Sequence, residues 1–315
     1  MIAVLTGGTG GAKFVDGLRH ILPPEDLTII VNTGDDFECW GLRISPDLDS
    51  ITYMLAGLLS KERGWGVGGD TFECLEAMRR LGQPAWFQIG DRDLATHLMR
   101  TQWLHGGQTL TEATAEIVRR LGIPSRILPM SDSPVETRIT TQDGEISFQE
   151  YFVLRRFRDA VKSVRFAGAE DAAPAPGVVE AIVSAEAVLV APSNPITSIG
   201  PILAIPGIHQ ALQKTGAPVV AVSPIVGAAP VSGPAGALMS AQGFPVSIAG
   251  VAQAYEDFLD TLVADVSDQA LAGTLPAGVE VHFTNILMKT AEDRVHLAKA
   301  VRAASESSDR ALSRA

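Results

Sequence analysis

The sequence has little of what would place it in several other protein classes. Its 315 residues include only two cysteines, Cys39 and Cys74, which show no metal-ligand spacing and cannot form a disulfide framework. Because disulfides are rare in reducing compartments, we expect free thiols in a cytoplasmic protein. The apolar runs are broken by Pro, Gly or Ser well before the ~20 residues that cross a bilayer. The chain opens on a strand pattern and a glycine loop rather than a basic and then apolar region, so we expect no signal peptide.

Positive charge is also scarce. The chain has 25 Lys and Arg against 36 Asp and Glu, a net charge of −11 and a pI of about 5.0. Such a protein repels nucleic-acid backbones and anionic membrane surfaces, so we expect neither as a partner. A small anionic ligand remains compatible, because local hydrogen-bond donors and a metal ion outweigh the overall charge.

Short β-branched runs alternate with helical patterns, which predicts an α/β fold with a parallel sheet. The hydrophobic fraction of 46% over this length allows one large domain or a domain with an insertion. The expected strands are Ile2–Leu5, Leu27–Val31, Trp86–Ile89, Ala187–Ala191, Val219–Val222, Val246–Ile248, Phe258–Val263 and Glu280–Phe283. The expected helices are Lys13–Ile21, Leu48–Leu59, Thr71–Leu81, Asp93–Gln102, Thr111–Leu121, Val178–Ser184, Pro201–Lys214 and Ala291–Ala304.

The pattern changes in the middle of the chain, where four short strands are expected and Asp143-Gly144 marks a hairpin. These strands are Val135–Thr141, Ile146–Phe148, Tyr151–Leu154 and Val161–Phe166. We therefore expect a nucleotide-binding core formed by residues 1–126 and 172–304, and a small inserted antiparallel subdomain at 127–171. The polar end, 305–315, is expected to be a flexible tail.

A glycine loop follows the first expected strand. Glycines let backbone N–H groups approach a phosphate, and a helix N-terminus adds partial positive charge. The P-loop pattern fails here because Ala12 precedes Lys13 and Phe14 follows it, and a dinucleotide fingerprint would need glycine in place of Lys13. A merely tight turn is the alternative, but it does not require four glycines. The residues predicted to bind phosphate or nucleotide are Gly8, Thr9, Gly10, Gly11 and Lys13.

Acidic residues follow or flank other expected elements. Carboxylates at strand ends suit Mg²⁺, which takes oxygen ligands and shares them with substrate phosphates. The predicted metal ligands are Asp35, Asp36, Asp47 and Asp49. Asp47 or Asp93 could instead be a helix cap, and Arg92, between Asp91 and Asp93, could be a structural ion pair or a fork for a phosphate. We expect His97 to form a buttressing hydrogen bond on the Asp93 helix rather than to bind metal, because no second His or Cys lies at ligand spacing.

Two later loops leave buried strands and offer hydroxyls, an amide and backbone donors. They add Ser193, Asn194, Ser223 and Gly227 to the predicted nucleotide or phosphate site, with a mobile surface loop as the alternative. Trp65 lies in a loop too rich in glycine to be core, so it is the best candidate for stacking on a flat substrate.

Several motifs together resemble the 2-phospho-L-lactate transferase family, the CofD-like enzymes of coenzyme F-420 biosynthesis. They occur in the family's order over residues 1 to about 265 and are GGTGGAK, NTGDD, SPDLDS, GDRDLATH, PMSDSPVET, APSNPITSIGPI and SPIVGAAPVSGPAG. The resemblance implies a Rossmann-like core with helices on both faces of the sheet, Mg²⁺ dependence and a homodimer.

The implied reaction moves a phosphorylated three-carbon acid from a guanosine-diphosphate-linked donor to the ribityl hydroxyl of the deazaflavin Fo and releases GMP. The acid stays open among phospholactate, phosphoenolpyruvate and phosphoglycerate. Asp49 and Gln88 fall on deazaflavin-contacting positions of the family, with Trp65 as a further contact, and catalytic roles are predicted for Asp49, Asp91 and Arg92. The alternative is a nucleotide-sugar-binding regulator of the same superfamily, which has no need of the GDRD and SPDLD motifs. A pyridine-nucleotide oxidoreductase is disfavoured by Lys13.

Overall fold

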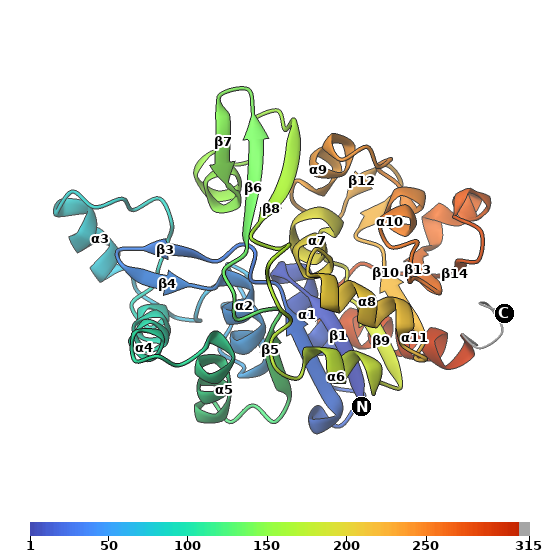
Figure 1. Cartoon of the computed structure of the whole chain (residues 1–315), viewed down its shortest axis with the longest axis horizontal. Coiled ribbons are helices and arrows are strands. Elements are labelled where there is room, and N and C mark those ends of the chain that lie inside the picture. Colours follow the sequence, from blue (N-terminus) through green and yellow to red (C-terminus); the bar gives the residue numbers. More distant parts are fainter. Residues whose placement is uncertain (309–315) are drawn as a thin grey trace.

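A seven-stranded parallel sheet forms the centre of the molecule. The structure, a computed structural model, describes residues 1–308, and within them the strands stand in the order β14-β13-β10-β9-β1-β2-β5 (Figure 1). Their bounds are β1 Ile2–Thr6, β2 Leu27–Val31, β5 Arg126–Pro129, β9 Ala187–Val190, β10 Val219–Val222, β13 Thr261–Asp265 and β14 Glu280–Thr284. From β1 the order runs outward one way to β5 and, from β9, the other way to β14. This is a Rossmann-like order, and ligands of such sheets bind where the order reverses, here between β1 and β9.

The inner strands are apolar because both faces of the sheet are covered. In β1 the side chains of Ile2 and Val4 join one core and those of Ala3 and Leu5 join the other. A strand buried on both faces has no polar side, which explains the continuous apolar runs of this sheet.

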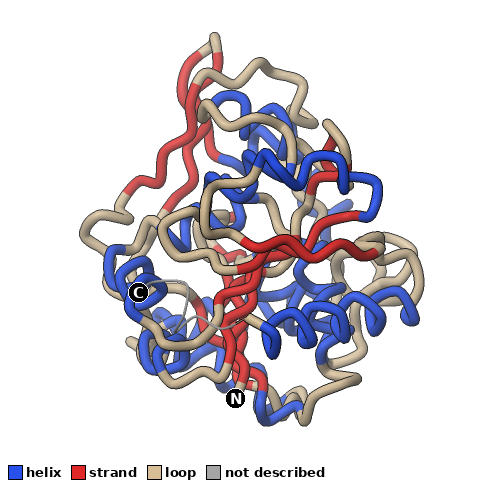
Figure 2. The backbone as a smooth tube through the Cα atoms, turned by 90° about the vertical axis from the view of Figure 1, so that its right-hand side faces the viewer, coloured by secondary structure: helices blue, strands red, loops and turns tan. Residues whose placement is uncertain are grey.

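Helices form a layer on each side of the sheet, as the view along its edge in Figure 2 shows. One core contains side chains of α1 (Gly8–Leu18), α2 (Pro46–Leu55), α5 (Leu110–Arg120) and α11 (Ala291–Ser307). The opposite core contains side chains of α6 (Val178–Val183), α7 (Gly200–Leu203), α8 (Pro206–Lys214), α9 (Ala235–Ala241) and α10 (Ile248–Ala254). The predicted Rossmann-like α/β fold is confirmed.

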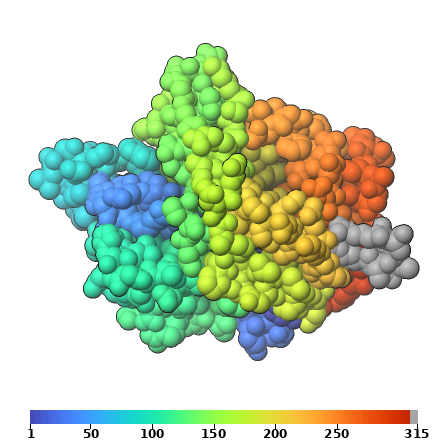
Figure 3. All heavy atoms as spheres, viewed as in Figure 1, coloured from blue at the N-terminus to red at the C-terminus, as the bar shows by residue number. Residues whose placement is uncertain are grey.

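Two smaller units project from this body (Figure 3). One is the small sheet β7-β6-β8, with β6 Glu136–Thr141, β7 Gly144–Ser147, β8 Ser163–Ala167 and the π-helix η2, Glu150–Leu154. The other is an arm containing β3 (Phe37–Cys39), β4 (Leu42–Ile44), α3 (Glu73–Arg80) and α4 (Asp93–His105). The short elements that remain are β11 Ile225–Val226, β12 Ala229–Pro230, the 3₁₀ helices η1 Pro24–Asp26 and η4 Val266–Thr274, and the π-helix η3 Pro195–Ile199.

Three strand predictions are wrong. Trp86–Ile89 is a loop whose Trp86 and Phe87 rings pack on Phe37 instead of pairing with a strand. Tyr151–Leu154 lies in the π-helix η2, where the apolar spacing serves a helical turn. Val246–Ile248 leads into α10, which begins at Ile248. In each case a short apolar run did not reveal which period it follows.

Several boundaries also move. The helix expected at Leu48–Leu59 ends at Leu55, and the one expected over Pro201–Lys214 is divided because Pro206 begins a second helix. Strand β5 pairs with β2 in the main sheet, so the small sheet begins after Pro129, later than the expected boundary at residue 127. Helix α11 continues to Ser307, and residues 309–315 of the expected tail lie outside the described residues.

Helices α1 and α11 approach so closely at Gly17 that a Cβ there would overlap the carbonyl oxygen of Arg294. Alanine normally favours a helix over glycine by about 1 kcal/mol. We nevertheless expect Gly17→Ala to lower the free energy of unfolding by about 1–3 kcal/mol, since the backbone of α11 must move. Urea unfolding measures this. Gly216→Ala is the control, because nothing lies within 4 Å of its Cβ position, and equal stability of the two variants would contradict the prediction.

Candidate functional site

A cleft of about 860 Å³ opens at the carboxyl ends of the central strands, over the boundary between β1 and β9. Its lining comes from every loop that leaves this edge of the sheet near that boundary and from the small sheet. This volume suits a ligand the size of a nucleotide derivative. The residues predicted from sequence that line it are Gly8, Thr9, Gly10, Lys13, Asp35, Asp47, Trp65, Gln88, Ser193, Asn194 and Ser223.

The glycine turn after β1 forms the floor of the cleft. Helix α1 begins here with no side-chain cap and no acidic residue in its first turn, and the N–H of Gly8, its first residue, donates to Asp47. The other N–H groups of this first turn are donors suited to an anion. The Ser193 hydroxyl accepts a hydrogen bond from Gly7 N at 3.3 Å and donates one to Gly7 O at 2.7 Å. A side chain on Gly7 would overlap Asp47 and Ser198, so only glycine lets these loops meet. Together these contacts form a tight glycine turn next to Lys13, suited to binding an anion.

Asn32, which the sequence reasoning missed, connects three of the loops. Its Nδ2 donates to Asp47 Oδ2 at 3.0 Å and to Thr197 O at 3.3 Å, and its Oδ1 accepts from Gly34 N at 2.8 Å. Its position as the first residue of the Asn32–Asp36 motif could have indicated this role, but the prediction from this motif was limited to the aspartates. Asn194 has a local role beside its place in the lining, since its Oδ1 accepts from Ile196 N at 3.0 Å and so caps η3.

Asp35 and Asp47 form an acidic pair at the cleft. Both are more than nine-tenths buried, and Asp35 Oδ1 has no hydrogen-bond partner among the described residues. Burial and the negative charge of Asp47 raise the pKa of Asp35 well above its ordinary value, and burial raises the pKa of Asp47 to about 6. Two adjacent carboxylates with too little positive charge are a suitable pair of ligands for a hard divalent cation.

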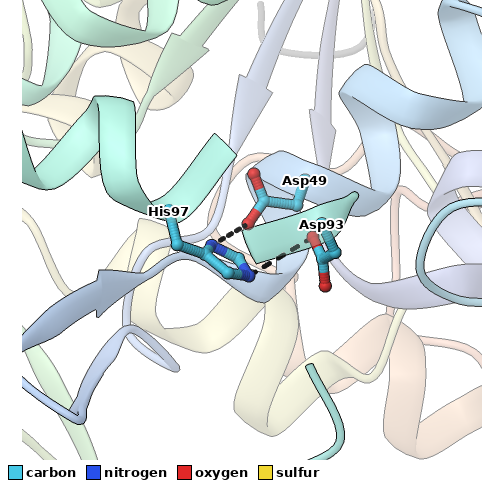
Figure 4. A group of neighbouring side chains, drawn as sticks. All are labelled: Asp49, Asp93 and His97. Carbon is cyan, nitrogen blue, oxygen red and sulfur yellow. Dashed lines mark ion pairs between the residues drawn. The ribbon is translucent and has the colours of Figure 1, made fainter. Parts of the chain in front are cut away.

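A second acidic group lies between α2 and α4, where His97 stands between Asp49 and Asp93 (Figure 4). One ligand atom from each residue lies within 4.8 Å of the others, so the group could hold a metal ion. Protein donors already meet these atoms. Arg100 binds both oxygens of Asp49, and the Tyr53 hydroxyl donates to Asp93 Oδ1 at 2.7 Å.

The charges of this second group are balanced within the protein. Burial alone would raise the pKa of Asp93, but the neighbouring His97, the hydroxyl of Tyr53 and the guanidinium of Arg100 lower it overall. His97 Nε2 lies 3.3 Å from Asp93 Oδ1 but has no well-oriented hydrogen-bond partner within residues 1–308, so the expected buttressing hydrogen bond stays a prediction. Asp49 itself does not line the cleft, because Arg100 holds its carboxylate inside the protein.

The remaining predicted residues lie outside the lining of the cleft. Asp36 accepts from the Ser45 hydroxyl at 2.6 Å and pairs with Arg43, while burial raises its pKa to about 7. Asp91 accepts from Thr71 Oγ1 and Cys74 N, at the start of α3.

Arg92 Nη1 donates to Gly68 O at 3.3 Å. Gly11 lies beneath the turn, where a Cβ would overlap Thr6 Oγ1, and Gly227 N donates to Asp268 Oδ1 at 2.8 Å.

Aromatic rings line the cleft on two sides. On the side of the arm, Trp65, Trp86 and Phe87 accompany Gln88, and the Arg63 guanidinium lies 5.3 Å from the Trp65 ring centre. On the side of the small sheet, Phe148 and Phe152 are stacked with ring centres 5.4 Å apart. Flat rings on both sides of an anion-binding turn fit a ligand with planar groups at both ends.

The sequence reasoning missed the whole contribution of the small sheet to the cleft: Phe148, Gln149, Phe152, Val153 and Arg156. Their helical spacing was the available signal, and it was hidden by the interpretation of Tyr151–Leu154 as a strand. It also missed Ile286, Leu287, Met288 and Lys289, in a loop without a distinctive motif.

The fold and cleft define a Rossmann-like α/β protein with a glycine turn at the switch point, an acidic pair beside it and aromatic walls. A family model described as 2-phospho-L-lactate transferase CofD matches residues 2–295. The chain belongs to this CofD family.

Similar proteins carry two names. The chain is 46% identical to a 2-phospho-L-lactate transferase of Methanosarcina mazei over 85% of this chain and 88% of that protein. It is 43% identical to a phosphoenolpyruvate transferase of Streptomyces griseus subsp. griseus, over 95% of this chain and 96% of that protein. A crystal structure of a UPF0052 family member from Bacillus halodurans shares the fold, with a TM-score of 0.65, 18% identity and coverage of 96% of this chain and 98% of that chain. In residues 1–308, no helix is both long and apolar enough to cross a membrane.

The acidic pair predicts a pH-dependent stability. Asp47 has a folded pKa of about 6, above its unfolded value, so its ionisation in the folded protein costs free energy. The cost is absent below the unfolded pKa, grows as pH rises through 4 to 6, and is complete above 6, where it amounts to at most about 3 kcal/mol. With chelator present, we expect Asp47→Asn to melt at a higher temperature than the wild type at pH 8, and at nearly the same temperature at pH 4.

Melting curves across this range test the prediction. Asp171→Asn is the control, because Asp171 is exposed and lies outside the cleft lining. A destabilised Asp47→Asn protein at pH 8 would contradict the interpretation.

Proposed function

We propose that this protein transfers a phosphorylated three-carbon acid from a guanosine-diphosphate-linked donor to the ribityl hydroxyl of the deazaflavin Fo, releasing GMP, in coenzyme F-420 biosynthesis. The observation that carries the proposal is one cleft that joins an anion-binding turn to two aromatic walls. Family membership supports the same reaction class, since the relatives are named for transfer of phospholactate or phosphoenolpyruvate. Both acids remain candidate donors.

Different residues of the cleft would bind the two substrates. The N–H groups at the start of α1 and the Lys13 ammonium would hold the diphosphate, because both present positive charge to the floor of the cleft. Trp65, Trp86 and Gln88 would hold the deazaflavin, whose fused rings need a flat apolar surface and polar groups at the edge. The two substrates then meet beside Asp35 and Asp47.

The acidic pair at the cleft would hold Mg²⁺. Asp35 Oδ1 lacks a partner within residues 1–308, and no protein cation neutralises the pair as Arg100 neutralises Asp49. The buried Asp49, Asp93 and His97 group is the less suitable place, since a bound ion would have to coexist with that arginine. When bound, Mg²⁺ would neutralise charge on the diphosphate and on the GMP leaving group.

The reaction is a displacement at phosphorus. The ribityl hydroxyl oxygen attacks the phosphorus that carries the acid. The bond between this phosphorus and the GMP oxygen breaks, and the hydroxyl proton is released to a carboxylate or to water. The chain's own contribution would be to align hydroxyl and phosphorus and to stabilise the charge that develops on the leaving oxygen. The backbone N–H groups of Gly8 to Gly10 are placed for the second task.

A binding-only role, as in a nucleotide-sugar regulator, would leave the wall of Trp65, Trp86 and Phe87 without a ligand. The likeness to the UPF0052 member supports the fold and no particular ligand. The homodimer implied by the family resemblance stays a prediction, which light scattering of the purified protein would test.

Mass spectrometry of the reaction products tests the proposed function directly. The purified protein is incubated with Fo, Mg²⁺ and a donor made in place from GTP, a guanylyltransferase and each acid in turn. We expect the Fo diester of one acid, together with GMP. A protein that converts none of the acids and does not bind Fo would rule the proposal out.

Removal of a charge from the acidic pair should reduce activity more than removal of a charge from a buried neighbour outside the cleft. We expect Asp35→Asn and Asp47→Asn to fold and to lose turnover by about 10²-fold or more, with much weaker Mg²⁺ binding by calorimetry. Asp36→Asn is a matched comparison, since this buried neighbour faces Arg43 rather than the cleft. Greater loss of activity in Asp36→Asn than in Asp35→Asn would contradict the assignment.

The catalytic role predicted for Asp49 is tested separately. Asp49→Asn leaves Arg100 with an uncompensated charge, so we expect a loss of stability of about 3–5 kcal/mol and a smaller loss of turnover than in Asp47→Asn. Denaturant unfolding and kcat are measured on the same preparations. A stable Asp49→Asn protein without activity would instead support direct participation of Asp49 in the reaction.

A further inference from the structure

One helical segment of the small sheet lies along the cleft and ends at an arginine. Gln149, Phe152 and Val153 line the cleft, and their spacing of three and four residues places them on one face of the helical segment. Arg156 also lines the cleft, two residues beyond the end of η2, and it is the last side chain of this segment that a ligand would meet.

The segment is held between two loops of the cleft. At its start, Gln149 Nε2 donates to Asp35 O at 3.3 Å. In its middle, the Phe152 ring lies 3.9 Å from the position of a Cβ on Gly233, in the loop after β10. The ring of Phe152 also stacks on Phe157, with centres 5.7 Å apart and planes at 19°. These contacts fix the position from which Arg156 leaves the helix.

The backbone at Arg156 is strained. The helix ends in a wide turn, in which Arg155 N donates to Glu150 O at 2.9 Å and Phe157 N donates to Tyr151 O at 2.8 Å. Arg156 then has φ 52° and Phe157 has φ 44°, both in the left-handed region. Glycine is the usual residue after such a helix end, because a Cβ is unfavourable there. An arginine at this position suggests that its side chain has a function that glycine could not supply.

The charge of Arg156 is also unused. Within residues 1–308 its guanidinium has no ion pair or hydrogen bond, whereas the adjacent Arg155 binds Glu150 at 2.7 Å and Asp159 at 3.3 Å. Two other cations line the cleft. Lys13 belongs to the helix that begins at the glycine turn, and Lys289 is near enough to Asp293 to lower the pKa of that carboxyl. Arg156 is thus the cleft cation that is remote in sequence from the phosphate floor and has no acidic partner.

We propose that Arg156 binds the carboxylate of the phosphorylated three-carbon acid, and so determines that the transferred group is an acid. This inference rests on the proposed function. The planar guanidinium matches a carboxylate with two parallel hydrogen bonds, which an ammonium group cannot do. The carboxylate is the one charged group of the donor besides its phosphates, it occurs in neither GMP nor Fo, and it needs a receptor that the phosphate floor and the deazaflavin wall do not provide.

The stable, fluorescent product of the reaction is the probe, since it contains the acid while Fo does not. Fluorescence titration gives the Kd of each. We expect Arg156→Ala to bind the product ~10- to 100-fold more weakly than the wild type, with Kd values for Fo and GMP changed less than about twofold. Arg156→Lys should recover part of the loss. In the transfer assay the KM for the donor rises while the KM for Fo stays the same.

Two variants separate recognition from a structural role. Arg158→Ala removes a nearby exposed guanidinium that does not line the cleft, and it should behave as the wild type. Arg156→Gly relieves the backbone strain and removes the side chain. We expect it to melt at a higher temperature than the wild type and yet to lose product affinity as Arg156→Ala does. A purely structural arginine would not separate stability from affinity in this way.

The outcomes are distinguishable. A wild-type protein that binds neither Fo nor the product would remove the proposed function itself. If the wild type binds the product more tightly than Fo and Arg156→Ala keeps the same preference, only the assignment of Arg156 would be overturned. An equal loss of Fo and product affinity in Arg156→Ala would likewise overturn it, because the residue would then support the cleft as a whole.

Discussion

The site depends on the contact between two turns that are almost two hundred residues apart in the chain. The Ser193 hydroxyl both accepts from Gly7 N and donates to Gly7 O, so the loop after β9 is joined to the loop after β1 at the switch point of the sheet. Asn32 adds the loop after β2 and the start of α2 through Thr197 and Asp47. These bonds use Gly7 N and fix the turn from which α1 begins, so the later N–H groups of its first turn are presented to the cleft in a defined position.

The two acidic groups show how the surroundings give identical side chains different chemistry. Asp49 pairs with Arg100, and Asp93 accepts from the Tyr53 hydroxyl and lies next to His97, so these carboxylates join α2 to α4. Asp47, two residues before Asp49 on the same helix, faces the cleft beside Asp35. Burial raises the pKa of both carboxyls there, and the charge of Asp47 raises that of Asp35 further. Helix α2 therefore presents an ion-paired carboxylate to the protein interior and a carboxylate without a cationic partner to the cleft, and spacing alone does not distinguish the two.

Much of this architecture could be predicted from the sequence, for physical reasons that also explain the failures. Strands such as Leu27–Val31 are almost entirely apolar because both faces are buried, and the glycine turn is recognisable from its composition. The inward direction of Asp49 could not be predicted, since it depends on Arg100, 51 residues away. The contribution of the small sheet to the cleft was missed because Tyr151–Leu154 forms a short π-helix, whose apolar spacing also fits a strand.

The close approach of α1 and α11 connects helix α11 to the glycine turn at the floor of the cleft. Helix α1 has the glycine turn at its first residues and Gly17 against the backbone of Arg294 near its last. Asp16 adds a hydrogen bond from Arg294 at 2.8 Å. Because α1 is continuous between these two ends, a displacement of α11 would also move the glycine turn that lines the cleft. The packing of a helix far from the cleft therefore constrains the geometry of the turn at the opposite end of its neighbour.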